Sequence, residues 1–234
     1  RVGDGKHINL VRYVSWLAKE YEKPKQQKQS IEDSRLKDLI AKNAARKAAQ
    51  DIGEIPAVEN PERREKACKD FRFFCETYFA DVFYLPWSDD HLQVIAKIEQ
   101  SVLDGGLFAF AMPRGSGKSA LTRSAAIWAI LIGARRYVCL IGSATRQSLN
   151  LFQSVQAAML GNHLLLADFP EVIYPIQCLE NSAHKQRGQR YNGQLTYPVW
   201  GTHKIVIPTI AGSIASGSVI TVDSLDSNIR GQIH

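Results

Sequence analysis

The sequence predicts an α/β fold: a P-loop NTPase with a central, mostly parallel sheet flanked by helices and preceded by a helical N-terminal extension. Three observations lead to this prediction. An apolar segment at 107–112 has the pattern of a short buried strand, a Gly-rich turn follows at 113–119, and a helical apolar pattern runs over 121–132. A second apolar strand pattern covers 137–141. The first 56 residues are instead polar, basic and helical in pattern.

The turn at 113–119 carries residue types that bind phosphate. Glycines let backbone N–H groups converge on phosphate oxygens, and the start of the next helix adds partial positive charge. Lys118 is expected to reach the β- and γ-phosphates of ATP, and the Ser119 hydroxyl to ligate Mg²⁺. The full pattern is G-x-x-x-x-G-K-[ST], and Met112 stands where its first glycine belongs. A surface turn that merely contains lysine is the alternative. The predicted nucleotide contacts are Pro113, Arg114, Gly115, Ser116, Gly117, Lys118 and Ser119.

Arg114 is an unusual residue inside this turn. A guanidinium beside the phosphates could bind the γ-phosphate or stabilise transition-state charge from within the same chain. It would then act with Lys118 as a catalytic residue. The alternative is an arginine that points to solvent or pairs with an acidic neighbour.

Several segments occur in an order and spacing more specific than any one of them alone. From Asp70 to the end, the chain resembles the ATPase domain of the large terminase subunit of tailed bacteriophages and prophages. The segments that carry the resemblance are FRFFCETYF (71–79), LPWSDDHLQVI (85–95), MPRGSGKS (112–119), YVCLIGSATRQSLNLF (137–152), PTIAGSIASG (208–217) and NIRGQ (228–232).

The resemblance implies a viral DNA-packaging motor that couples ATP hydrolysis to translocation of double-stranded DNA into a procapsid. Its implied cofactors are ATP and Mg²⁺, and its implied partners are DNA, a portal protein, a small terminase subunit and further copies in a ring. The resemblance places the motor in the host bacterial cytoplasm, outside the mature virion. It also places His91 and Gln93 near the adenine, and Thr145, Arg146, Gln147 and Arg230 where DNA contact is coupled to the nucleotide.

The same resemblance implies that this chain holds only part of the active site. In the family, an apolar strand ending in paired acids, the Walker B strand, follows the Arg230-Gly231 segment, and a nuclease domain comes later. Both are expected after His234, so the chain alone is expected to be catalytically incomplete. The sequence VITVDSLD (219–226) imitates a Walker B strand. If that strand is the true one, Asp223 becomes a Mg²⁺ ligand.

Two other functions remain open at the level of sequence. One is a different P-loop DNA translocase, such as a helicase. The other is a truncated, non-catalytic regulator that binds nucleotide or DNA.

The N-terminal extension, residues 1–56, is predicted to be two helices, at 8–21 and 31–50. Pro24 is expected to end the first helix, and the polar stretch 23–30 to act as a linker. From Lys6 to Lys47 there are 11 Lys/Arg against 5 Asp/Glu, a net charge of +6. A DNA- or partner-docking arm is one interpretation, and a solvated helical hairpin is the other. The remainder, 57–234, is assigned to the ATPase domain.

Local signals predict several helix starts in this domain. Asn60 is expected to cap a helix whose first residue is Pro61, and Ser88 is expected to cap another helix. Ser143 or Thr145 is a candidate cap for the helix after the second strand. The helix that begins at Pro61 is expected to bury one stripe of side chains, namely Ala67, Phe71, Phe74, Cys75 and Tyr78.

Composition sets the remaining limits. The net charge of +6 and the pI near 9.1 are compatible with a polyanionic partner. The four cysteines form no CxxC pair and are expected to be reduced thiols. No apolar run is long enough to predict a membrane span.

Overall fold

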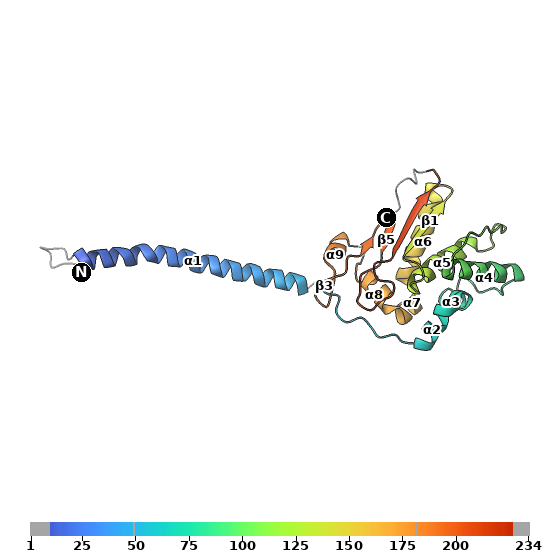
Figure 1. The fold of residues 1–234 in the computed structure, drawn as a ribbon, viewed down its shortest axis with the longest axis horizontal. Helices are drawn as coiled ribbons and strands as arrows, with labels where there is room; N and C mark the ends of the chain where they lie inside the picture. The colour runs from blue at the N-terminus through green and yellow to red at the C-terminus, as the bar shows by residue number, and fades with distance from the viewer. Residues whose placement is uncertain (1–9, 49, 181, 227–234) are drawn as a thin grey trace. The chain divides into compact units, whose positions relative to one another are not determined.

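The computed structural model describes residues 10–48, 50–180 and 182–226 (Figure 1). Contacts within the chain divide it after Ala49 into two units. The composition had suggested a boundary after residue 56. Residues 50–52 already belong to the second unit, because Gln50 O accepts from Arg190 N (2.8 Å) and Ile52 N donates to Arg190 O (2.9 Å).

The described residues of the first unit form one helix, α1 (Leu10–Ala48), which runs through Pro24 without a break. The predicted end at Pro24 and the linker at 23–30 are therefore wrong. Lys and Gln dominate residues 23–30, and both favour helix, so one proline is accommodated among good helix formers. Near its two ends α1 exposes large apolar side chains, namely Leu10, Val11, Val14, Leu36, Leu39 and Ile40.

The second unit is a mixed α/β structure. Its helices are α2 (Pro61–Lys69), α3 (Phe71–Tyr78), α4 (Asp89–Leu103), α5 (Lys118–Leu131), α6 (Thr145–Gly161), α7 (His163–Asp168), α8 (Pro170–Gln177) and α9 (Ala183–Gly188). Its strands are β1 (Tyr137–Gly142), β2 (Arg190–Tyr191), β3 (Gln194–Leu195), β4 (Val199–Trp200), β5 (Lys204–Val206) and β6 (Val219–Ser224). In the described part of the chain, no helix is both long and apolar enough to cross a bilayer.

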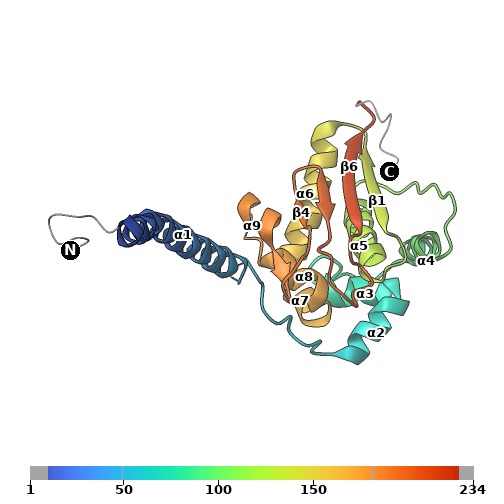
Figure 2. The same cartoon turned by 60° about the vertical axis from the view of Figure 1, so that its left-hand side comes forward.

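The main sheet has the order β1-β6-β5-β4, and only its β1–β6 pair is parallel. The expectation of a mostly parallel sheet is therefore wrong. Helical crossovers separate β1 from β6, whereas the segments joining β4, β5 and β6 contain no helix, which suits antiparallel pairing. Helices α5 and α6 pack on β1, and α6 also packs on β6 (Figure 2).

The predicted strand at 107–112 does not form. This segment joins α4 to α5 without regular structure, Leu107 is fully exposed, and Phe110 is 40% exposed. Its apolar pattern is that of a strand, but a strand also needs a neighbour for its backbone hydrogen bonds. Among the described residues, β1 hydrogen-bonds to β6 alone, and no strand pairs with residues 107–112.

The first helix of the second unit begins where the sequence predicts. Asn60 caps α2, accepting a hydrogen bond from Arg63 N (2.9 Å), and Pro61 is the first helical residue, as predicted. One expected helix is divided at Asp70, which ends α2 and caps α3 through Phe73 N (2.8 Å). The aromatic stripe predicted to be core is buried on both sides of this break: Ala67, Phe71, Phe74, Cys75 and Tyr78.

A buried ionic network joins α2, α3 and α7, and no sequence pattern indicated it. Asp168 is fully buried and accepts from Arg63 Nε (2.6 Å), Arg63 Nη2 (2.7 Å) and the Tyr78 hydroxyl (2.5 Å). Burial, followed by the hydrogen bond to Asp168, raises the pKa of Tyr78. The network joins α7 to both α2 and α3.

Candidate nucleotide-binding site

The turn before α5 contains two glycines in a left-handed backbone conformation. Gly115 (φ 81°) and Gly117 (φ 77°) both adopt left-handed conformations that side chains with a Cβ rarely take. Gly117 is the N-cap of α5, and no side chain caps the helix there. The first N–H groups of a helix have no partner within the helix, and they carry partial positive charge. This end of α5 is thus suited to an anion.

Lys118 is held inside the loop itself. Its Nζ donates to Met112 O (2.5 Å) and to Pro113 O (2.6 Å). The Ser116 hydroxyl also donates to Pro113 O (2.8 Å). To reach a phosphate, the ammonium group has to exchange these two carbonyl oxygens for phosphate oxygens.

His91 connects α4 to the loop. Its Nε2 lies 3.0 Å from Ser116 O, and its Nδ1 lies 2.6 Å from Ser88 Oγ. A carbonyl oxygen can only accept, so Nε2 carries the proton in this contact. Ser88 is the N-cap of α4, as the sequence predicted.

A cavity of about 550 Å³ lies between α4 and the segment that leads into the loop. Four predicted site residues line it: His91, Gln93, Pro113 and Ser116. Its wall includes Phe108 and Phe110, whose rings are near-parallel with centroids 6.3 Å apart. An aromatic wall with a few polar groups is typical of a pocket for a flat organic ligand.

The remaining loop residues lie near this cavity in sequence but do not line it. Ser119 is exposed in the first turn of α5. Arg114 is exposed at the turn, and among the described residues it forms no salt bridge. Of the two alternatives for Arg114, pairing with an acidic neighbour is not seen.

Three of the four predicted coupling residues, Thr145, Arg146 and Gln147, follow the carboxyl end of β1. Thr145 Oγ1 is 3.0 Å from Ser224 Oγ at the end of β6, and Gln147 Oε1 accepts from Ser143 Oγ (2.6 Å). Ala144, not Ser143 or Thr145, is the N-cap of α6, so the capping expected of those two is wrong. Arg146 is exposed on the first turn of α6, and Arg230 lies outside the described residues.

Asp223 is part of β6, opposite Ile141 of β1. Its Oδ1 accepts from Ser224 N (2.7 Å). Within the described ranges, no three His, Cys, Asp or Glu side chains gather in a way that could hold a metal ion. The four cysteines are all free thiols.

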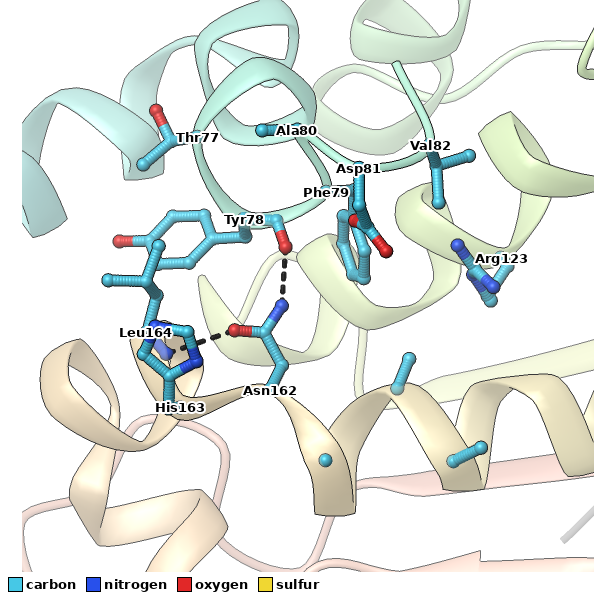
Figure 3. Close-up of a pocket in the computed structure, with 13 residues that line it drawn as sticks. Thr77, Tyr78, Phe79, Ala80, Asp81, Val82, Arg123, Asn162, His163 and Leu164 are labelled. Atoms are coloured by element: carbon cyan, nitrogen blue, oxygen red, sulfur yellow. Dashed lines mark hydrogen bonds between the residues drawn. The ribbon is translucent and has the colours of Figure 1, made fainter. Parts of the chain in front are cut away.

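A second cavity, of about 410 Å³, is lined by the end of α3 and the residues after it, by Arg123 of α5, and by the junction of α6 and α7 (Figure 3). Asn162 stands at its centre, donating to Tyr78 O and capping α7 through Leu164 N (3.0 Å). Arg123 lies over the Phe79 ring at 5.1 Å, and burial lowers its pKa. Because Asp81 also lines this cavity, its charges are mixed. None of the predicted nucleotide contacts lines it, so it does not compete with the α4 cavity for that role.

No protein-family model matches this chain, and no curated protein and no solved structure matches it either. The resemblance to terminases therefore rests on the quoted motifs alone.

Proposed function

We propose that the second unit is the nucleotide-binding part of a P-loop ATPase, of the type that packages viral DNA. One observation supports the nucleotide site: two left-handed glycines precede the uncapped N-terminus of α5, and the Lys118 ammonium bonds the carbonyls of Met112 and Pro113, two residues that line the 550 Å³ cavity. The terminase motifs supply the rest of the assignment.

The chain's own groups fit Mg²⁺ and ATP. The N–H groups at the start of α5 and the Lys118 ammonium suit phosphate oxygens, and the Ser119 hydroxyl suits Mg²⁺. The α4 cavity suits the base, and the exposed Arg114 is free to approach the phosphates. Bound Mg²⁺ would neutralise phosphate charge.

Nucleotide binding by this chain is directly measurable. Saturating Mg-ATP is expected to raise the free energy of unfolding by about 2.7 kcal/mol at a concentration 100 times Kd. Thermal unfolding of the purified chain, with and without Mg-ATP, measures this shift. ATP turnover is expected to stay at the level of Lys118→Ala. No thermal shift at millimolar Mg-ATP would contradict the assignment, and turnover well above the variant would contradict the incompleteness of the chain.

The basic helix α1 supports the DNA part of the proposal. Removing residues 1–49 leaves the contacts of Gln50 and Ile52 intact, so the second unit should keep its fold. We expect double-stranded DNA affinity to fall, and the slope of log K against log salt to become shallower by about 0.9 for each lost phosphate contact. Fluorescence anisotropy at several salt concentrations measures both quantities. Unchanged affinity and slope would show that α1 is not a DNA contact.

A further inference from the structure

Among the described residues, His91 is the one residue outside both the loop and α5 that hydrogen-bonds to a carbonyl of the phosphate loop. In the part of the loop before Gly117, three carbonyls accept hydrogen bonds: those of Met112 and Pro113 from Lys118, and that of Ser116 from His91. Lys118 and the Ser116 hydroxyl belong to the loop and move with it. His91 belongs to α4, so its bond ties the loop to a separate helix.

Both nitrogens of the His91 ring are occupied in this arrangement. Nε2 bonds Ser116 O and Nδ1 bonds Ser88 Oγ, while Trp87 packs against the ring at 5.9 Å between centroids. Neither nitrogen is left for the edge of a base. Gln93, two residues along α4, lines the same cavity and has an amide that can serve that purpose.

The bond to Ser116 O has a geometric consequence for the opposite side of the same peptide unit. In a planar trans peptide the C=O and N–H groups point in opposite directions. Holding Ser116 O toward α4 therefore turns the Gly117 N–H away from α4. Gly117 immediately precedes α5, so this N–H belongs to the group of donors available to a phosphate.

We propose that His91 is a positioning residue that holds the phosphate loop in its binding shape through Ser116 O, and does not contact the base. This inference rests on the proposed nucleotide site. Preorganisation of a loop improves affinity by reducing the ordering required on binding. Loss of the bond should therefore weaken every ligand that uses the phosphate loop, whatever base it carries.

Two ligands separate positioning from base contact: Mg-ATP, and Mg-tripolyphosphate, which has phosphates but no base. His91→Phe keeps a flat ring for stacking and loses the donor to Ser116 O. We expect it to weaken both ligands equally, by about 3- to 10-fold, the usual worth of one neutral hydrogen bond. Isothermal titration calorimetry gives both dissociation constants.

Two further variants separate the hydrogen bond to Ser116 O from contact with the base. His91→Gln places an N–H donor near the position of Nε2 and should recover most of the affinity for both ligands. Gln93→Ala should weaken Mg-ATP and leave tripolyphosphate unchanged. Circular dichroism of each variant checks that the helical content is retained. If His91→Phe loses helical content, the test uses the affinities of His91→Gln for the two ligands.

The outcomes also separate this inference from the proposed function. If His91→Phe weakens ATP but not tripolyphosphate, or weakens neither, the positioning role is overturned while the nucleotide site stands. If the unaltered chain binds neither ligand, the nucleotide site and the positioning role are both overturned.

Discussion

Lys118→Ala is expected to weaken Mg-ATP binding by about 10- to 100-fold. A hydrogen bond to a charged group contributes about 1.5–3 kcal/mol, and 1.4 kcal/mol corresponds to about a tenfold change in affinity. In the present structure Lys118 already bonds Met112 O and Pro113 O, so the ammonium gains phosphate contacts only by giving up two carbonyl contacts. That exchange limits the loss to this range. Isothermal titration calorimetry with Mg-ATP measures it.

Lys69→Ala is the matched control for this prediction. Lys69 is an exposed lysine on α2 whose Nζ pairs with Glu65 (2.6 Å), away from the α4 cavity. It changes the net charge of the chain by the same amount as Lys118→Ala. Equal losses of affinity in the two variants would mean that general charge, and not the phosphate loop, attracts the nucleotide.

Asp168→Ala is expected to lower the free energy of unfolding by about 3–5 kcal/mol, because it leaves the Arg63 charge without its carboxylate partner. The same change leaves the buried Tyr78 hydroxyl without its acceptor. Equilibrium unfolding in urea, followed by tryptophan fluorescence, measures the change. Trp128 is a suitable reporter, because it is fully buried and donates to Ala67 O (2.8 Å) on α2.

Glu65→Ala provides the comparison. Glu65 also pairs with a basic residue of α2, Lys69, but both side chains are mostly exposed. Such surface pairs contribute about 0–1 kcal/mol. If Asp168→Ala were no more destabilising than Glu65→Ala, the buried network would not hold α7 in place.

The sequence predicted those features that depend on a few neighbouring residues. Asn60 and Ser88 cap their helices where their side chains can reach the first free N–H groups. Gly115 and Gly117 mark the loop because the backbone there needs left-handed angles. Each of these features depends on a few neighbouring residues and not on the rest of the chain.

Features that depend on distant partners were missed or wrong. The apolar pattern at 107–112 gives no information on whether a neighbouring strand is present, and the parallel or antiparallel sense of a sheet depends on its connections. Asp168 and Arg63 are far apart in sequence, and no spacing links them. The contact between His91 and Ser116 O likewise could not be predicted from the sequence, because it depends on how α4 packs beside the loop.

The outer edge of β1 has consequences for handling the protein. In the described part of the chain β1 is paired on one side only, and the strand contains no charged residue. Tyr137 and Ile141 are about half exposed on it. Natural sheets usually protect an edge strand with charged residues, proline or a covering element, because its unpaired backbone groups can hydrogen-bond to the backbone of another chain. We therefore expect self-association through the edge of β1 at high protein concentration. The binding measurements above should be made in dilute solution.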